Sequence, residues 1–294
     1  MKDLSIDISW TFDDGPTEFT FDLLKFLHKK NCIPATWFIA RHNLYKFDSY
    51  SYLAGLQEIG HEIAIHEIHP TIGGKSWFPA PSNSYLSIRD AVDDLKIFCK
   101  ELSSLGVVPH FVRLPYGEFS ELTTYLKTVA CPEDQVFQIA LNIIDGKSIP
   151  TKFNFVQKDY TFLLKSLKQL GLLIWSGSGK EFPLLGGGNY LYNSWQAESA
   201  GITSGRGADN VTMRQAKCRK DSGIVEEKMG LFEEAVFQVK TKKIERSLVI
   251  LAHDTSEEDV NKICQDINWM ESFTSANGLK IRYKTLSQLF HAIR

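Results

Sequence analysis

The sequence from residue 5 to residue 16 is SIDISWTFDDGP. Polar residues alternate here with apolar ones at positions 6, 8, 10 and 12, and this period of two predicts a β-strand with one well-buried face. The strand runs into Asp13-Asp14-Gly15-Pro16, which are residues typical of a turn. Helical spacing from Phe19 to Leu27 and an apolar run from Ala35 to Ala40 follow. The segment therefore predicts a strand–helix–strand unit.

The same alternation of strands and helices continues along the chain. The predicted helices are Ser51 to Ile59, Ile88 to Leu102 and Tyr160 to Leu170, and the predicted strands are Glu62 to Ile65, His110 to Tyr116, Gly171 to Trp175 and Ser247 to Leu251. Alternating elements of this kind indicate a parallel sheet with helices outside it, as a barrel or as a doubly wound sheet. The expected fold class is α/β.

Composition excludes several classes of protein. The chain has 294 residues, of which 43% are hydrophobic, so it has ample material for a core and is not a disordered or fibrous protein. A net charge of −2 gives no electrostatic basis for binding nucleic acid. Five scattered cysteines indicate reduced thiols, and neither a secretory signal nor a membrane span is recognisable. We expect a cytoplasmic protein with no membrane insertion.

Ionisable residues follow four of the predicted strands. These residues are Asp13 and Asp14, His66 and His69, Arg113, and His253. The carboxyl ends of parallel strands meet on one face of an α/β fold, so we expect one site there. A carboxylate with two imidazoles suits zinc or another divalent first-row metal and leaves positions for water and substrate. The pattern predicts a hydrolytic metal site.

Several short motifs, in this order, resemble those of the NodB-type polysaccharide deacetylases, carbohydrate esterase family 4. Residues 11–16 (TFDDGP) resemble the first family motif, and residues 60–70 (GHEIAIHEIHP) resemble the second. Residues 113–117 (RLPYG) resemble the third motif and residues 251–255 (LAHDT) the fifth. Residues 175–182 (WSGSGKEF) align by spacing with the fourth, which in the family normally ends in Asp-Trp. The resemblance covers residues 4–182 and 247–290.

The resemblance implies a role for each matching residue. Asp13 would be the general base held by Arg113, and His253 would be the general acid, with Glu181 in place of the aspartate that supports it in the family. Asp14, His66 and His69 would hold one divalent metal ion, with zinc as the first choice and cobalt, nickel and manganese as the others. Pro115, Tyr116, Phe182 and Leu251 would line the substrate site, and the Tyr116 backbone N–H would complete the oxyanion hole.

The second motif departs from the family pattern. Family members generally place the two histidine ligands four residues apart, whereas His66 and His69 are three apart with Glu67 between them. Positions i+3 and i+4 both lie on one face of a helical turn, so joint ligation remains compatible with this spacing. The alternatives are that Glu67 enters the coordination sphere or that the metal is lost.

The resemblance implies a distorted or incomplete (β/α) barrel formed by a single domain over residues 1–294, with insertions at about 118–158 and 183–245. The expected activity is metal-dependent removal of acetyl from an N-acetylated sugar, such as an intermediate of O-antigen or capsule biosynthesis. Two alternatives stay open, namely hydrolysis of a C–N bond in another small molecule and a catalytically inactive, glycan-binding role. The sequence does not indicate an oligomeric state. His61, outside the expected site, is interpreted as a structural residue.

Overall fold

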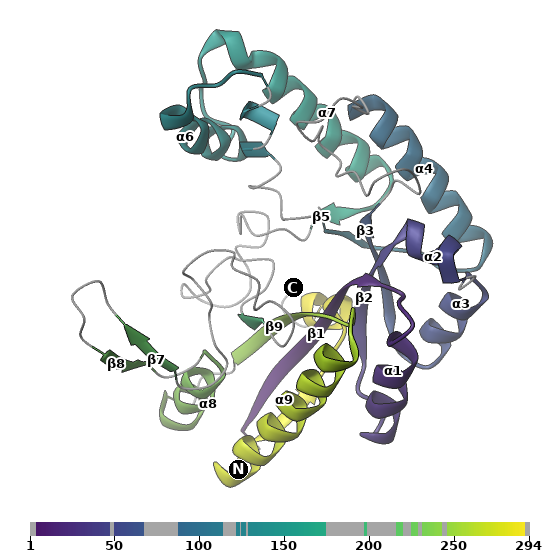
Figure 1. Ribbon diagram of the computed structural model, residues 1–294, viewed down its shortest axis with the longest axis vertical. Coiled ribbons are helices and arrows are strands. Elements are labelled where there is room, and N and C mark those ends of the chain that lie inside the picture. The colour runs from purple at the N-terminus through teal and green to yellow at the C-terminus, as the bar shows by residue number, and fades with distance from the viewer. Residues whose placement is uncertain are drawn as a thin grey trace.

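A computed structural model describes residues 4–47, 50–67, 88–113, 122–123, 125–127, 129–174, 197–198, 216–219, 225–228, 231–242 and 246–291. Helices surround a central sheet whose strands pair in parallel, which confirms the predicted α/β class (Figure 1). Within these ranges no helix is both long enough and apolar enough to cross a membrane.

The main sheet consists of β1 (Ser5–Gly15), β2 (Ala35–Ala40), β3 (Glu62–Glu67), β4 (Phe111–Val112), β5 (Leu173–Ile174), β6 (Ala197–Glu198), β9 (Arg246–His253) and β10 (Lys280–Tyr283). A separate antiparallel pair contains β7 (Ala216–Arg219) and β8 (Val225–Lys228). The helices are α1 (Thr20–Lys29), α2 (Arg41–Phe47), α3 (Tyr50–Glu58), α4 (Ile88–Ser104), α6 (Glu133–Ile144), α7 (Asn154–Gln169), α8 (Leu231–Lys242), α9 (Glu257–Ala276) and α10 (Leu286–His291), with a 3-10 turn at Thr151–Phe153.

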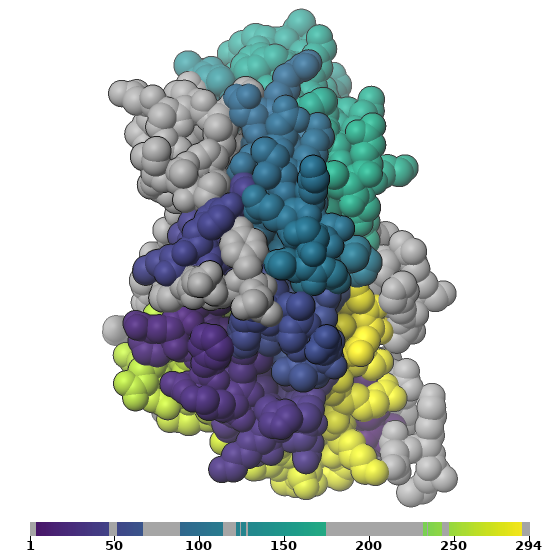
Figure 2. Space-filling model, turned by 90° about the vertical axis from the view of Figure 1, so that its right-hand side faces the viewer, coloured from purple at the N-terminus to yellow at the C-terminus, as the bar shows by residue number. Residues whose placement is uncertain are grey.

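Strand β1 is the centre of the sheet, whose order is β5-β4-β3-β2-β1-β9-β6. One edge of β1 pairs with β9. The other edge is shared, because β2 pairs with β1 from Trp10 onward while β10 pairs with residues Ser5 to Ile8. The N-terminal and C-terminal parts of the chain therefore lie side by side, as the adjacent purple and yellow surfaces in Figure 2 show.

The two faces of β1 are chemically different. Its apolar residues Ile6, Ile8, Trp10 and Phe12 are fully buried in the main hydrophobic core, together with residues of the surrounding helices. Its polar residues Ser5, Asp7, Ser9, Thr11 and Asp13 are also buried, on what we call the inner face. In the register of the sheet this face also carries Phe38, Ala64, Phe111 and Val249, against which Leu286 and Leu289 of α10 pack.

Element boundaries differ from the sequence prediction mainly at the strand ends. Strands β1, β3 and β9 extend far enough to include Asp13, His66 and His253, which the sequence placed in the turns that follow. Because His66 is a strand residue, the argument that His66 and His69 share a helical turn is wrong. Helix α7 begins at Asn154 rather than at Tyr160.

The sequence analysis did not predict α2, which follows β2 directly without a turn residue between them. The predicted insertion at 118–158 contains α6, the 3-10 turn and the start of α7, and the insertion at 183–245 contains β6, β7, β8 and α8. The single-domain organisation stays a prediction.

Candidate active site

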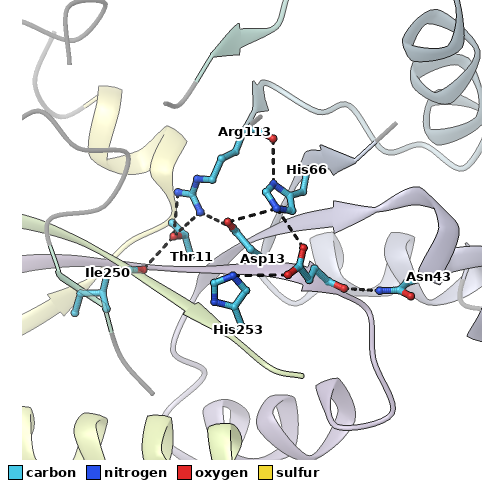
Figure 3. Close-up of polar contacts among 8 residues, drawn as sticks. Thr11, Asp13, Asn43, His66, Arg113, Ile250 and His253 are labelled. Atoms are coloured by element: carbon cyan, nitrogen blue, oxygen red, sulfur yellow. Dashed lines mark hydrogen bonds and ion pairs between the residues drawn. The ribbon is translucent and has the colours of Figure 1, made fainter. Parts of the chain in front are cut away.

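The ends of four strands bring the predicted ionisable residues together. Asp13 on β1 lies in register with His253 on β9. On the other side of the site, the Arg113 N–H donates to the Ile65 carbonyl at 2.8 Å, which places Arg113 beside His66. Figure 3 shows these side chains converging at the carboxyl edge of the sheet. This is the edge at which parallel α/β folds bind their ligands.

Asp13 and Arg113 form a buried ion pair. Arg113 is 1% exposed and Asp13 is 2% exposed, and the Arg113 Nη1 donates to Asp13 Oδ1. The guanidinium also lies over the Phe38 ring, 3.9 Å from its centroid. Burial lowers the pKa of Arg113, and the negative charge of Asp13 acts against this effect. The charge of each buried group is therefore compensated by the other.

Asp14 has a left-handed backbone conformation, with φ of 65°. Its carboxylate lies between two imidazoles, with Oδ1 3.2 Å from His66 Nε2 and Oδ2 3.7 Å from His253 Nε2. Burial raises the pKa of Asp14, but the hydrogen bond and charge of His66, helped by His253, outweigh it and lower the pKa to about 2. The side chain of Asp14 is 47% exposed, in contrast to that of Asp13, so a ligand can reach it.

His66 is oriented by the backbone. Its Nδ1 lies 3.0 Å from the carbonyl oxygen of Arg113, and an N–H there donates to that oxygen. Nε2 then faces Asp14 and, at 3.8 Å, Oδ2 of Asp13. Burial lowers the pKa of His66, but the two carboxylates outweigh burial and raise the pKa to about 9. The site thus favours a positive charge next to Nε2.

His253 has one ring nitrogen directed into the site and one directed away from it. Nε2 faces Asp14, while Nδ1 is buried and has no hydrogen-bond partner among the described residues. A buried imidazole nitrogen ordinarily has a partner. The sequence analysis named Glu181 as that partner, and Glu181 lies outside the described residues.

The turn that carries Asp14 is fixed from two sides. Asn43, near the start of α2, donates its Nδ2–H to the Asp14 carbonyl. On the other side, the fully buried Asp254 accepts a hydrogen bond from the Thr20 hydroxyl, and its backbone carbonyl accepts one from the Thr17 hydroxyl. Burial raises the pKa of Asp254 to about 6. These contacts join the β1–α1 turn to the end of β9.

The structure places five of the predicted site residues next to one another, namely Asp13, Asp14, His66, Arg113 and His253. Leu251 is buried on β9, two residues before His253. The other five, His69, Pro115, Tyr116, Glu181 and Phe182, lie outside the described residues. His61 is buried, its Nδ1 accepts a hydrogen bond from the Ala35 N–H at 3.1 Å, and its ring packs edge-on against Trp37, as the structural interpretation expects.

The donor set fits a divalent cation in its chemistry. Asp14 supplies a carboxylate and His66 a ring nitrogen oriented by a backbone carbonyl, which is the usual arrangement of a histidine ligand and its supporting group. In the described part of the chain no three His, Cys, Asp or Glu side chains form a group that could hold a metal ion. Asp14 and His66, two of the three predicted ligands, are adjacent, and the third, His69, lies outside the described residues.

Two contributors to the site were missed from the sequence. Asn43 follows β2 in a helix that the sequence did not predict, so no signal was available for it. Thr11 was quoted as part of the first motif but was given no role, although its hydroxyl contacts Arg113. The position of Thr11 on the same face of β1 as Asp13 is the signal that could have identified it.

Carboxylates, an arginine and imidazoles at the strand ends of a parallel α/β fold are the groups that hydrolases use to move protons at a carbonyl. Comparison with protein families specifies the class further. Residues 4–130, less than half of the chain, match the family model described as Polysaccharide deacetylase. Members of this family are hydrolases that act on the C–N bond of N-acetyl groups.

Solved structures of deacetylases are similar to the chain at low sequence identity. The catalytic domain of peptidoglycan N-acetylglucosamine deacetylase from Eubacterium rectale has 20% identity and a TM-score of 0.47, over 96% of this chain and 89% of that one. Peptidoglycan deacetylase PdaC from Bacillus subtilis has 15% identity and a TM-score of 0.46, over 98% and 91%. A family 4 carbohydrate esterase from Streptomyces lividans has 15% identity and a TM-score of 0.41, over 92% and 89%. Comparison with curated proteins gives no match.

Proposed function

We propose that this protein is a metal-dependent N-deacetylase that removes the acetyl group from an N-acetylated sugar. The observation that carries the proposal is the position of Asp13. A carboxylate that is 2% exposed and clamped by Arg113 lies in register with a histidine on the neighbouring strand. Asp13 as the base and His253 as the acid would then lie on either side of the substrate amide, as its hydrolysis requires.

Asp14, His66 and His69 would hold the metal ion, with zinc as our first choice. A divalent cation bound there supplies Lewis acidity, which polarises the amide carbonyl and acidifies water. The described ligands support this assignment, because His66 directs Nε2 toward the exposed carboxylate of Asp14. Two carboxylates, those of Asp13 and Asp14, face Nε2 of His66, and their negative charge would also stabilise a cation bound there.

The protein's own side chains would move the protons. Oδ1 of Asp13 accepts a hydrogen bond from Arg113, so Oδ2 is the oxygen that would accept a proton from the attacking water. The water oxygen bonds to the carbonyl carbon, and His253 donates a proton to the nitrogen as the C–N bond breaks. The products are acetate and the free amine of the sugar. Glu181 would accept a hydrogen bond from the buried Nδ1 of His253 and keep the imidazole charged.

The substrate would enter over the exposed edge of Asp14. Leu251, Pro115 and Phe182 would surround the acetyl group, and the Tyr116 backbone N–H would stabilise the oxyanion. The burial of Leu251 two residues from His253 supports its part in this assignment.

We further propose that the protein is cytoplasmic and acts on an intermediate of surface polysaccharide biosynthesis, such as O-antigen or capsule. The thiols support a reducing compartment, because Cys32, Cys99, Cys131 and Cys264 are all free. Acetate release from soluble N-acetylated sugar derivatives, compared with release from polymeric chitin, tests the substrate class. Release from the polymer alone would contradict it.

Metal content and acetate release, measured on the same variants, test the proposed function. We expect Asp13→Asn to retain the metal and lose about 10²- to 10⁴-fold in kcat, the range for a general base. His66→Ala and His69→Ala should lose both metal and activity. His28→Gln, far from the site on α1, is the control and should change neither. Wild-type protein that neither contains nor takes up zinc, cobalt, nickel or manganese would overturn the proposal in favour of a glycan-binding role.

A further inference from the structure

Thr11 lies at the junction of three strands, next to the buried ion pair of the site. It is fully buried on β1, between Asp13 and the rest of the inner face. Its Oγ1 donates to the Ile250 carbonyl on β9 at 3.0 Å. The same oxygen accepts hydrogen bonds from both terminal nitrogens of Arg113, from Nη1 at 3.2 Å and from Nη2 at 3.1 Å. Figure 3 shows these contacts.

The hydroxyl of Thr11 uses its full bonding capacity in these contacts. A hydroxyl has one hydrogen to donate and two lone pairs that accept. Because the hydrogen is committed to Ile250, both lone pairs face the guanidinium. This polarity suits a cation, since a hydroxyl whose hydrogen points away presents its negative end to the positive group.

Two other contacts of Arg113 lie among the described residues, one with the Phe38 ring and one with Asp13. The torsion that matters is rotation about the Nε–Cζ bond, which exchanges Nη1 and Nη2, and stacking on Phe38 does not by itself set which nitrogen faces Asp13. Asp13 contacts Nη1 through a single oxygen, which does not by itself oppose rotation about that contact. Thr11 contacts both Nη1 and Nη2, and a second point of attachment stops the rotation.

We propose that Thr11 is a positioning residue, which locks the orientation of the Arg113 guanidinium so that Arg113 holds Asp13 by Oδ1 and leaves Oδ2 to accept the proton. The inference rests on the proposed function, because Asp13 is the base only in that reaction. The hydrogen bond from Thr11 to the Ile250 carbonyl also connects the Arg113–Asp13 ion pair to β9, at a position three residues before His253. Strand β9 then helps to position both the base, Asp13, and the acid, His253.

Two variants of Thr11 separate the contribution of the hydroxyl from that of the rest of the side chain. Thr11→Val keeps the shape and removes the hydroxyl, and we expect kcat to fall by about 10- to 100-fold because a base displaced by a fraction of an ångström loses much of its effect. KM should change by less than about threefold, since Thr11 is buried and lies behind Asp13. Thr11→Ser restores the hydroxyl and should recover kcat to within about threefold of the wild type.

Ser9→Ala is the matched control. Ser9 lies two residues earlier on the same face of β1, is fully buried, and its hydroxyl has no hydrogen-bond partner among the described residues. We expect its kcat to equal that of the wild type. An equal loss in Ser9→Ala and Thr11→Val, an unchanged kcat in Thr11→Val, or a Thr11→Ser variant as slow as Thr11→Val would each overturn the proposal.

Nitrogen NMR of the guanidinium tests the same inference without activity. In the wild type, rotation of the buried Arg113 group is hindered, so its two Nη nitrogens should give separate signals, assigned by their loss in Arg113→Lys. In Thr11→Val these signals should broaden or merge, and in Thr11→Ser they should stay separate. If no N-acetylated substrate releases acetate but the signals behave in this way, the proposed function fails and the positioning by Thr11 stands. Unchanged signals in Thr11→Val would show that Thr11 does not lock the guanidinium.

Discussion

Two histidines of the chain, His66 and His61, illustrate how surroundings determine the behaviour of a side chain. His66 faces two carboxylates, which raise its pKa to about 9. His61 is equally enclosed but has no carboxylate beside it, and burial lowers its pKa to about 4. His61 is consequently neutral at pH 7, and its Nδ1 accepts the hydrogen bond from Ala35. The same residue type is thus suited to hold positive charge at one position and to fill the core at another.

His61 gives the protein a predictable loss of stability in acid. Between about pH 6.5 and pH 4 the unfolded chain binds a proton at His61 that the folded chain excludes, so the free energy of unfolding falls as the pH falls through this window. The full loss, reached near pH 4, is about 3 kcal/mol at 1.36 kcal/mol for each pKa unit. We expect His61→Gln to remove this part of the pH dependence in urea unfolding. The control, His110→Gln, alters an exposed histidine that is not among the groups acting on the pKa of His61, and it should keep the wild-type slope. Equal slopes in all three proteins would contradict the prediction.

At the scale of elements, Arg41 links the short helix α2 to α4. Arg41 is 4% exposed, and its guanidinium reaches two carboxylates of α4. Nη1 lies 2.7 Å from Asp94 Oδ1, and Nη2 lies 2.6 Å from Glu101 Oε1. Burial lowers the pKa of Arg41, but Glu101 and Asp94 outweigh it and raise the pKa above its usual range. Since α2 also carries Asn43, this link supports the turn at Asp14.

Arg41→Lys should therefore destabilise the protein although it keeps the charge. A lysine has one nitrogen and cannot match the forked contacts to two carboxylates, so we expect a loss of about 1–3 kcal/mol in the free energy of unfolding. Lys25→Met breaks the exposed pair with Asp22 and should cost less than about 0.5 kcal/mol. Similar losses for the two variants in urea unfolding would refute the distinction between them.

At the scale of the whole molecule, the last helix closes the inner face beneath the site. Leu286 and Leu289 of α10 pack against Phe38, on which Arg113 rests. Two buried polar residues hold the start of the helix. The Glu62 carboxylate accepts from the Ser287 N–H at 3.0 Å, and the Thr36 hydroxyl accepts from the Leu286 N–H at 2.9 Å. The end of the chain thus supports a site built mostly from its first half.

Leu289→Ala should lower the free energy of unfolding by about 2–5 kcal/mol, because it leaves a cavity under the inner face. We also expect lower kcat in the folded variant, since Phe38 supports Arg113. Phe237→Ala removes a larger side chain that is 52% exposed on α8, and it should cost less than about 1 kcal/mol. An equal loss of stability from both substitutions would show that α10 does not fill the core as described.

The α/β class and the strand ends that carry the site could be predicted from the sequence. Periodicity depends on which face of an element is buried, and this is a local property that β1, β2 and α1 display in consecutive residues. Asp13 and Asp14 could be predicted as site residues because residues 11–16 resemble the first family motif and further motifs follow in the same order, whereas carboxylates in such a turn would not suffice by themselves. The helix α2 and the strand position of His66 could not be predicted, because their boundaries depend on neighbouring strands.

Partners across the sheet were decided by tertiary structure. The sequence contained Thr11, Asn43, Glu62 and Arg113 but gave no indication that Thr11 contacts Arg113 over 102 positions, or that Glu62 contacts Ser287 over 225. Such contacts depend on strand order and register, which follow from the packing of the whole chain rather than from any segment of it. Local sequence therefore determined which groups could do the chemistry, and the fold determined which of them meet, because hydrogen bonds and ion pairs require a distance of a few ångströms that only packing can impose.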